Sequence, residues 1–496
     1  MRPSLLNTRN APGQLDAAGI HFVDSKTGQD SKPDRRKETM SHAAKAQWKQ
    51  RKKGPLQSWI NPCQSIKRAK TNSGWSEESR SPRPLPRLKM VGGYFCGTEL
   101  PPGIEPGVIQ ELVNVIELGK YGTYPYEVCL HVHAVERGWF PYMISDICCI
   151  HSMMFGLRAF LDKTRDSRKN KSLAAFHHSQ TLQHLQARIN AFEKDPNAFV
   201  FDDSTIMVVI NLAMTAEFEG DLTTVRTHVD GLLKMVSLKG GLRSLSMHNN
   251  LQVKVCRADI ALGLHQGTSP RLFRDDINWD CFIAGRGLIR CSHKPHEAQI
   301  GGFIDGLNQQ LSNCWKDIHA FCCLSNMAYQ TGGKFSPETY NEMMISIFYR
   351  LMHLSFTDDG MQRLIRIGLL TYCSTIFLIR MYQANPFSRL HDLFSTELRV
   401  NFQSTSRCLP QSVLFWLLMI YNLVAYKDSC RTEWQTVWLD ETIALDKTAT
   451  WSDASTLLKS VMWVDFVHDA AGMKIFDAAV ERLGGSGLND ESATTS

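Results

Sequence analysis

The sequence lacks the long apolar runs that membrane-spanning and secreted proteins carry. Its two most apolar segments, 413–426 and 367–379, are both shorter than the roughly 20 residues that a spanning helix needs. The first 20 residues contain no continuous apolar run, so we expect no signal peptide. These two absences predict a soluble chain without a membrane partner.

Cysteine pairs with the spacing of structural zinc sites are also missing. The chain has 14 cysteines, and no two of them are arranged as Cys-x2-Cys. The neighbouring pairs Cys148–Cys149 and Cys322–Cys323 lie among apolar residues, as small buried hydrophobes commonly do. We therefore expect reduced, buried thiols in a reducing compartment rather than a secreted disulfide framework.

Fingerprints of enzymes and cofactor sites are scarce. There is no Gly-x-Ser-x-Gly elbow, and neither Gly285-Arg-Gly287 nor Gly332-Gly333-Lys334 has the spacing of a phosphate-binding loop. Of two acidic pairs, Asp202-Asp203 favours a helix start and Asp358-Asp359, followed by Gly360, favours a turn. No histidine cluster completes a four-ligand metal set, whether His131-Val-His133, His177-His178 or Cys291-Ser-His293 with His296. We predict that the chain is not an enzyme and has no catalytic, cofactor or metal site.

What the sequence does have is a strongly basic head. Residues 1–89 hold 19 Lys/Arg and 7 Asp/Glu, a net charge of +12, whereas the remaining 407 residues carry a net charge of −6. The head is rich in Ser, Pro and Gln and ends in the proline-spaced segment 79–87. This composition predicts that residues 1–90 are mostly disordered, with a basic helix over about 34–53 as the one exception.

Two basic clusters in this head are separated by 13 residues, as in a bipartite nuclear-import signal. The candidate residues are Arg51, Lys52 and Lys53 in the first cluster, and Lys67, Arg68 and Lys70 in the second. Extended cations of this kind reach acidic pockets on an import carrier. The alternatives are a solvated charge run, and direct phosphate binding that is salt-dependent and blind to sequence.

Helical periodicity begins near residue 104, and it is clearest over 181–240. A first helix ends at Asp195-Pro196, and a second begins at the acidic cluster 202–205. This second helix is apolar nearly all round, which indicates burial on most sides. A third helix has a one-sided apolar stripe and ends at Lys239-Gly-Gly-Leu242, where glycine suits a left-handed cap. The segment therefore predicts three helices joined by short turns.

Similar periodicity recurs in the segments 312–329, 337–354, 360–383, 410–426 and 454–479. Strand-like alternation is scarce, and no fixed-period repeat is present. We predict an all-α fold, an irregular multi-helix bundle or array. The expected domains are a disordered head over 1–90, a helical body over 91–485 and a disordered tail over 486–496.

The segment 202–242 also carries a set of residues in a fixed order: Asp203, Glu217, Gly220-Asp221, His228, Gly231-Leu232 and Gly240-Gly241, with Asp259 and Pro270 continuing the pattern. This set resembles the middle homology region of fungal-specific transcription factors, in particular the subfamily with a long all-helical effector body. The head is similar to such proteins at 22–24 and 35–53. We expect the motif residues to be structural, with the glycines serving turns and close helix packing.

The resemblance implies a nuclear regulator of transcription that controls a metabolic or secondary-metabolite gene set. Full members hold two zinc ions with six N-terminal cysteines, but this chain has only Cys63 and Cys96 in its first 128 residues, so the zinc-cluster reading is rejected. We expect contacts with the transcription machinery or another regulator, and leave homodimer formation and direct DNA contact by the head open. Another alternative to the nuclear regulator is a helical enzyme or binding protein for a small apolar molecule, which the many Met, Phe and Trp residues of the body suggest.

Overall fold

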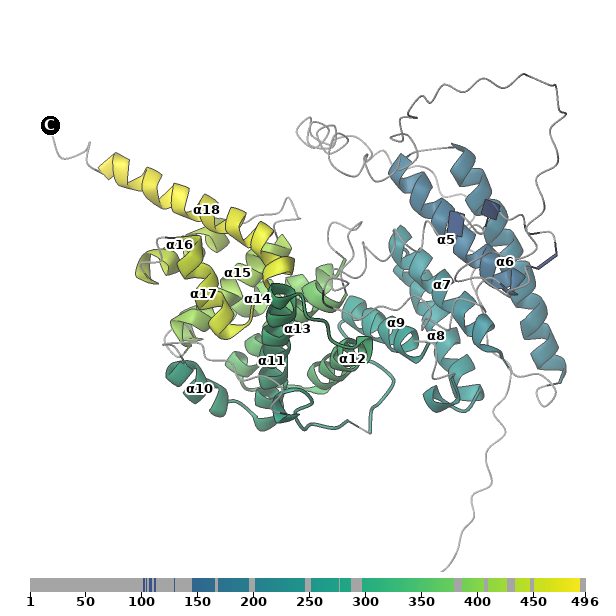
Figure 1. Ribbon diagram of the computed structural model, residues 1–496, viewed down its shortest axis with the longest axis horizontal. Helices are drawn as coiled ribbons and strands as arrows, with labels where there is room; N and C mark the ends of the chain where they lie inside the picture. The colour runs from purple at the N-terminus through teal and green to yellow at the C-terminus, as the bar shows by residue number, and fades with distance from the viewer. Residues whose placement is uncertain are drawn as a thin grey trace, which may run out of the picture. The chain divides into compact units, whose positions relative to one another are not determined.

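The structure, a computed structural model, describes residues 101–102, 104, 107–108, 111–112, 129, 145–165, 168–195, 201–245, 251–275, 277–286, 297–378, 386–405, 409–425, 433–446 and 450–490 (Figure 1). All of them belong to one of two compact units, which comprises 1–23 and 89–496. The other unit, 24–88, contains both predicted import clusters and lies outside the described residues. The predicted all-α fold is confirmed, since the described part of the chain contains helices and no strand.

Helices α5 to α8 form two hairpins. Helices α5 (Ile147–Arg165) and α6 (Arg168–Lys194) pack along their length, as do α7 (Asp203–Glu219) and α8 (Leu222–Leu238), and α5 also packs on α7. The three helices predicted over 181–240 are therefore confirmed as part of α6, and as α7 and α8. The all-round burial predicted for α7 is also confirmed, because each residue from Ile206 to Ile210 is no more than 4% exposed.

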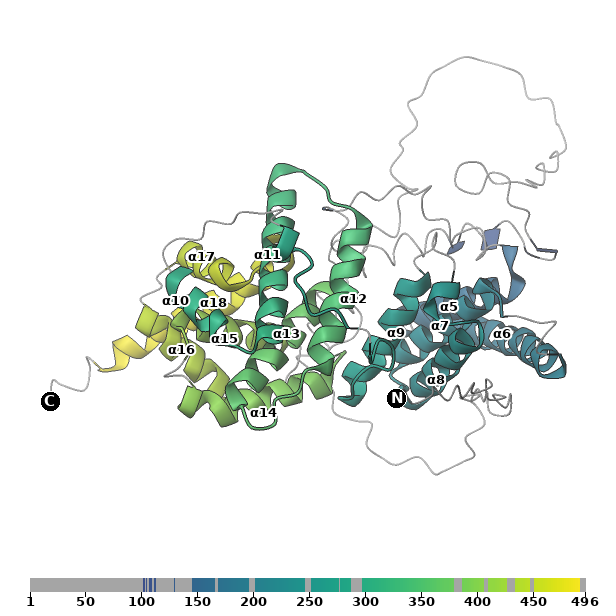
Figure 2. The same ribbon diagram turned by 90° about the horizontal axis from the view of Figure 1, so that it is seen from below.

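Ten further helices follow in the described chain. They are α9 (Leu251–Gln266), α10 (Glu297–Asp305), α11 (Gln309–Thr331), α12 (Pro337–His353), α13 (Gly360–Phe377), α14 (Ser388–Thr405), α15 (Gln411–Ala425), α16 (Glu433–Asp446), α17 (Trp451–Val461) and α18 (Asp465–Asp490). In Figure 2, α11 and α12 are neighbours, and contacts join α9 to α12 and α14. Because α18 continues to Asp490, the boundary expected at residue 485 falls inside a helix.

The largest core lies among the later helices. Helix α15 is buried almost along its whole length, and Trp416 on it donates its indole N–H to the carbonyl of Met462 at 2.7 Å. Trp315 and Trp463 are also fully buried, and the Trp315 and Trp416 rings lie 5.9 Å apart. The described part of this apolar stretch, 413–425, is thus a core helix, as its short length predicted. No helix in the described ranges is long and apolar enough to cross a membrane.

A buried carboxylate fastens a long loop onto this core. Asp317 on α11 is inaccessible to solvent and accepts the backbone N–H groups of Phe282, Ile283 and Ala284 at 2.8–3.0 Å. Its charge is balanced by Arg350 on α12, whose guanidinium lies 2.7 Å away and is also buried. A buried charge is tolerated when it is paired and fully hydrogen-bonded, and this arrangement satisfies both conditions.

The described cysteines are free thiols. Cys148, Cys149 and Cys322 are buried as predicted, whereas Cys323 is half-buried. The predicted helix start at Asp202 is also confirmed, because Asp202 accepts the N–H of Thr205 at 2.8 Å at the beginning of α7. Asp359, which was expected to be part of a turn, instead caps α13 by accepting the N–H of Gln362 at 2.9 Å.

Candidate functional site

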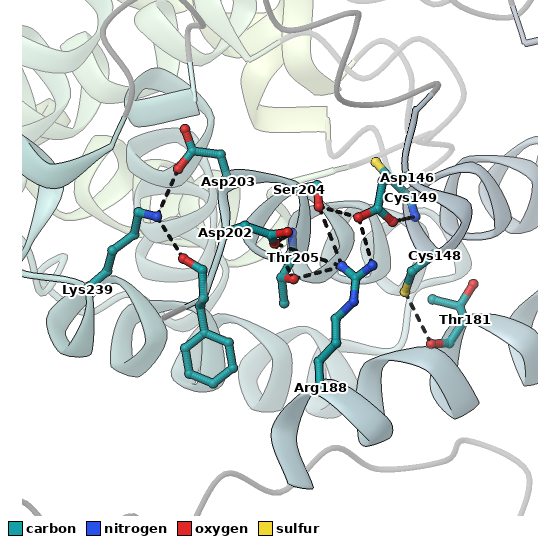
Figure 3. A network of polar contacts seen from close by, with 11 residues as sticks. Asp146, Cys148, Cys149, Thr181, Arg188, Asp202, Asp203, Ser204, Thr205 and Lys239 are labelled. Carbon is teal, nitrogen blue, oxygen red and sulfur yellow. Dashed lines mark hydrogen bonds and ion pairs between the residues drawn. The ribbon is translucent and has the colours of Figure 1, made fainter. Parts of the chain in front are cut away.

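The segment 202–242, which carries the motif residues Asp203 to Gly241, is held at its beginning by a polar cluster that we call the clasp. The clasp consists of Asp146, Arg188, Asp202, Ser204 and Thr205 (Figure 3). Arg188, on α6, places one guanidinium nitrogen 2.7 Å from the Asp146 carboxylate before α5. Its other terminal nitrogen lies 2.8 Å from the Thr205 hydroxyl in the first turn of α7. The Ser204 hydroxyl donates to the same Asp146 carboxylate. One arginine therefore ties the start of α5, the middle of α6 and the start of α7 together.

The clasp forms because two helices begin with aspartates. Asp146 accepts the backbone N–H of Cys149 at 2.9 Å and so caps α5, while Asp202 caps α7. Burial would raise the pKa of Asp202, but hydrogen bonds from Thr205 and the charge of Arg188 outweigh it and lower the pKa. Burial would likewise lower the pKa of Arg188, yet the charge and hydrogen bonds of Asp146 raise it. Arg188 thus favours the charged form of Asp202, and Asp146 favours the charged form of Arg188.

The two ends of the motif meet in space. Lys239, the residue after α8, lies 3.3 Å from the Asp203 carboxylate and donates to the Phe201 carbonyl at 2.7 Å (Figure 3). The chain then turns through Gly240 and Gly241, whose φ values of 106° and 86° favour glycine. Asp203 and the Gly-Gly pair therefore close the α7–α8 hairpin at its open end.

The middle of the motif makes the turn between α7 and α8. Gly220 ends α7 with a φ of 86°, and Asp221 caps α8 by accepting the N–H of Thr224 at 3.0 Å. Glu217 lies 3.1 Å from His265 Nε2, which joins α7 to α9. These residues therefore end α7, begin α8 and link α7 to α9.

His228 and Gly231 are buried on α8. Burial is the main cause that lowers the pKa of His228 to about 4, and the nearby His178 adds to it. His228 is therefore a neutral imidazole at physiological pH. The structure thus places both motif residues in the interior of the four-helix group.

Asp259, which follows the segment 202–242, also joins separate parts of the chain through hydrogen bonds. This buried carboxylate on α9 accepts the N–H groups of Arg271 and Leu272 at 3.0 Å, and the hydroxyl of Tyr349 on α12 at 2.8 Å. Pro270, which the pattern pairs with Asp259, immediately precedes these two donors. The carboxylate therefore connects α9, the loop that follows it and α12.

Sequence reasoning missed Asp146, Arg188, Lys239 and Tyr349 as partners of the motif. One signal was available for Arg188, because a charge between the apolar residues Leu185 and Ile189 has to find an acceptor. The other three partners, Asp146, Lys239 and Tyr349, lie in or next to helices. Helical periodicity alone does not determine how these helices pack against one another.

The clasp borders two thiols that are weak nucleophiles. Cys148 lies 3.6 Å from the Thr181 carbonyl, and burial raises its pKa to about 12 (Figure 3). Burial also raises the pKa of Cys149 well above its ordinary value. A thiolate is the reactive form of cysteine, so these groups are inert at neutral pH. The clasp therefore serves to position α5, α6 and α7 relative to one another.

The candidate import residues Arg51, Lys52, Lys53, Lys67, Arg68 and Lys70 lie outside the described residues, as do His131 and His133. Within the described ranges, no group of three or more His, Cys, Asp or Glu side chains is arranged to hold a metal ion. No family model matches the chain, and neither a curated protein nor a solved structure matches it. The resemblance of 202–242 thus depends on its residues alone.

Proposed function

We propose that this chain is a nuclear regulator of transcription, of the fungal-specific type, which acts through protein contacts made by its helical body. The observation that carries the proposal is the use of the motif residues. Asp203, Gly220, Asp221 and the Gly240–Gly241 pair each close or cap the α7–α8 hairpin. A motif with this architectural role suits a domain that presents surfaces to partners.

The division of charge supports the same proposal. The head carries a net charge of +12, and the rest of the chain carries −6. A basic segment with two clusters 13 residues apart provides a nuclear-import signal. The acidic body is repelled by the negative charge of nucleic acid. The proposed division of labour is therefore import by the head and partner binding by the body.

The first test is the localisation of the full chain fused to a fluorescent protein. Replacing Arg51, Lys52, Lys53, Lys67, Arg68 and Lys70 by Ala should shift the fusion from the nucleus to the cytoplasm. The matched control replaces Arg80, Arg83, Arg87 and Lys89 by Ala. These substitutions also remove positive charge from the head but lie outside the two clusters, so the control fusion should remain in the nucleus. Exclusion of the unmodified chain from the nucleus would end the proposal.

The second test is transcript profiling after deletion of the gene, with rescue by Arg188→Met. Loss of the clasp should weaken the rescue, whereas Arg226→Met, at an exposed ion pair on α8, should rescue fully. A deletion that alters no transcripts under conditions in which the protein is expressed would refute the regulatory role.

The basic head also favours a second candidate, direct binding to DNA phosphates. The full chain should then shift duplexes of unrelated sequence alike, and its affinity should fall steeply between 50 and 200 mM salt, as counterion release requires. A variant with both import clusters replaced by Ala should have a shallower salt dependence. Failure of the unmodified chain to bind at low salt would eliminate this candidate.

A further inference from the structure

Three histidines line the contact between α5 and α6. The Nδ1 atoms of His151 on α5 and His177 on α6 lie 2.9 Å apart and the ring centroids 5.1 Å apart, so the two rings meet in a direct N–H···N hydrogen bond. The ring of His184, two turns further along α6, stacks on that of His151 with the centroids 6.1 Å apart and the planes at 15°. His151 is buried, and the other two are half-buried. The link between the two helices is therefore made by groups that titrate.

The number of protons on the pair decides whether this hydrogen bond exists. A neutral imidazole has one N–H group and one acceptor nitrogen, whereas an imidazolium has two N–H groups and no acceptor. The bond therefore tolerates one added proton, carried by the donor ring, and is abolished when both rings are protonated. Two imidazolium N–H groups would then face each other across 2.9 Å.

The charges that act on the two rings oppose protonation. His184 on α6 acts on His151, and Arg158 on α5 acts on His177. Arg158 is itself ion-paired with Glu111. Among the described residues, no carboxylate acts directly on either ring. A second proton on the pair is thus not compensated by a counter-charge.

Helix α7 also packs on α5 and adds no charge to the pair. Its Asn211 donates to the hydroxyl of Ser152, the residue after His151, at 2.9 Å. The pKa of Asp202, in the clasp at the start of α7, is lowered from its ordinary value, mainly by its hydrogen bonds from Thr205. This carboxylate therefore keeps its charge under conditions in which imidazoles become protonated.

The pair makes the contact sensitive to acid. Burial lowers the pKa of His177 to about 4 and also lowers that of His151. When the helices separate, both rings return to an ordinary pKa near 6.5. The closed form thus binds fewer protons than the open form, so the contact has its full stability above about pH 6.5 and loses it as the pH falls toward about 4.

We propose that the hydrogen bond between His151 and His177 is an acid-released latch, and that protonation of both rings separates α5 from α6 around it. The separation uncovers Cys148 and Cys149, which are inaccessible to solvent and lie about one turn before His151. Cys148 Sγ lies 3.6 Å from the Thr181 carbonyl on α6, so this thiol is part of the contact that opens (Figure 3). The latch is independent of the proposed function.

The test measures the reactivity of these thiols in the full reduced chain. The probe is 2,2′-dithiodipyridine, a disulfide that reacts with thiols in acid: the thiol forms a mixed disulfide and 2-thiopyridone leaves. Mass spectrometry follows the loss of the peptide with free Cys148 and Cys149 at about pH 7 and about pH 4.5. Each rate is divided by that of the urea-unfolded chain at the same pH, which removes the direct effect of pH on the reagent.

Three chains are compared. They are the unmodified chain, His177→Asn and the control His391→Asn on α14. Asparagine at 177 keeps an amide near the position of Nδ1, does not titrate, and can still accept a hydrogen bond from protonated His151. Because His228 and His468 are also buried with lowered pKa values, acid weakens other parts of the chain, so the differences between the matched chains define the latch. Cys373 on α13, which is inaccessible to solvent, is the reference thiol in each chain.

If opening returns His177 to its ordinary pKa, the fall from about pH 7 to about pH 4.5 favours the open form roughly 50-fold. The unmodified chain and His391→Asn should show about this increase in the relative labelling of Cys148 and Cys149. The increase in His177→Asn should be at least about fivefold smaller, while Cys373 responds alike in all three chains.

Two results would overturn the latch. If His177→Asn shows the same increase as the unmodified chain, the acid sensitivity arises elsewhere. If Cys373 gains as much labelling as Cys148 and Cys149 in the unmodified chain, acid unfolds the chain as a whole. Far-ultraviolet circular dichroism at about pH 7 confirms that each variant is folded, and His177→Gln replaces His177→Asn if the latter is not.

Discussion

Arg188→Met is the sharpest perturbation of the clasp, because methionine preserves much of the apolar stem and removes the guanidinium. The substitution deletes the contacts to Asp146 and Thr205. A hydrogen bond to a charged group contributes about 1.5–3 kcal/mol, and one between neutral groups about 1 kcal/mol. The Arg188 side chain is 22% exposed, which screens part of this, and Asp146 retains the N–H of Cys149 and the hydroxyl of Ser204. We expect a loss of about 2–3 kcal/mol.

Hydrogen exchange read peptide by peptide measures this loss locally. Residues 140–278 contain no tryptophan, so tryptophan fluorescence does not report α5 to α8 directly and serves as an internal control. Amides in α5, α6 and α7 should exchange roughly 30- to 100-fold faster in Arg188→Met, since each 1.4 kcal/mol is a factor of ten. The matched control is Arg226→Met, which removes an exposed pair at 3.9 Å on α8 and should cost less than about 0.5 kcal/mol.

If Arg188→Met accelerates amide exchange in α5, α6 and α7 no more than Arg226→Met does, Arg188 does not stabilise these helices through the clasp. A double-mutant cycle with Asp146→Asn isolates the pair itself, and its coupling energy should be on the order of 1–2 kcal/mol. A coupling near zero would assign any loss to the contact with Thr205 rather than to the pair with Asp146.

Three further perturbations have defined outcomes. Asp317→Asn leaves Arg350 buried without its counter-charge and should cost about 3–5 kcal/mol in urea unfolding followed by tryptophan fluorescence, whereas Lys316→Ala, one residue away at an exposed pair, should cost less than about 1 kcal/mol; similar midpoints would contradict the assignment. Gly220→Ala should lower the melting temperature, because its φ of 86° costs a side chain about 1–2 kcal/mol although the space is open, while Gly301→Ala in α10 should raise it slightly. His228 is neutral in the fold with a pKa of about 4 and binds a proton in the unfolded chain near pH 6.5, so it should destabilise the fold progressively as pH falls from about 6.5 to about 4, by up to about 3 kcal/mol. His228→Gln should flatten the dependence of the unfolding midpoint on pH in that window, and an unchanged slope would count against this role.

The sequence predicted those parts of the fold that depend on short-range chemistry. Asp202, Gly220 and the Gly240–Gly241 pair mark helix ends because capping and positive φ are properties of one turn of chain. The burial of α7 followed from its composition, since a helix that is apolar on all sides has to be covered on all sides.

The candidate site was less accessible to sequence reasoning because its partners are distant in the chain. Arg188 meets Asp146 across 42 residues, and Tyr349 meets Asp259 across 90. His151 and His177, whose Nδ1 atoms lie 2.9 Å apart, likewise meet across 26 residues because α5 and α6 pack on each other. One-dimensional patterns identify which residues face inward but do not determine which inward residues meet.

The hydrogen bond from Trp416 to the Met462 carbonyl has a consequence for the order in which the chain can fold during synthesis. Asn326 likewise bonds the Trp463 carbonyl and the Asp465 N–H, 137 and 139 residues further on. The hairpins α5–α6 and α7–α8 can close soon after they leave the ribosome, because their partners are near in sequence. Helices α11 and α15 have to wait until residues 462–465 have been synthesised. Until then their polar groups and apolar faces are exposed, so premature termination before residue 462 should yield a nascent chain that depends on chaperones.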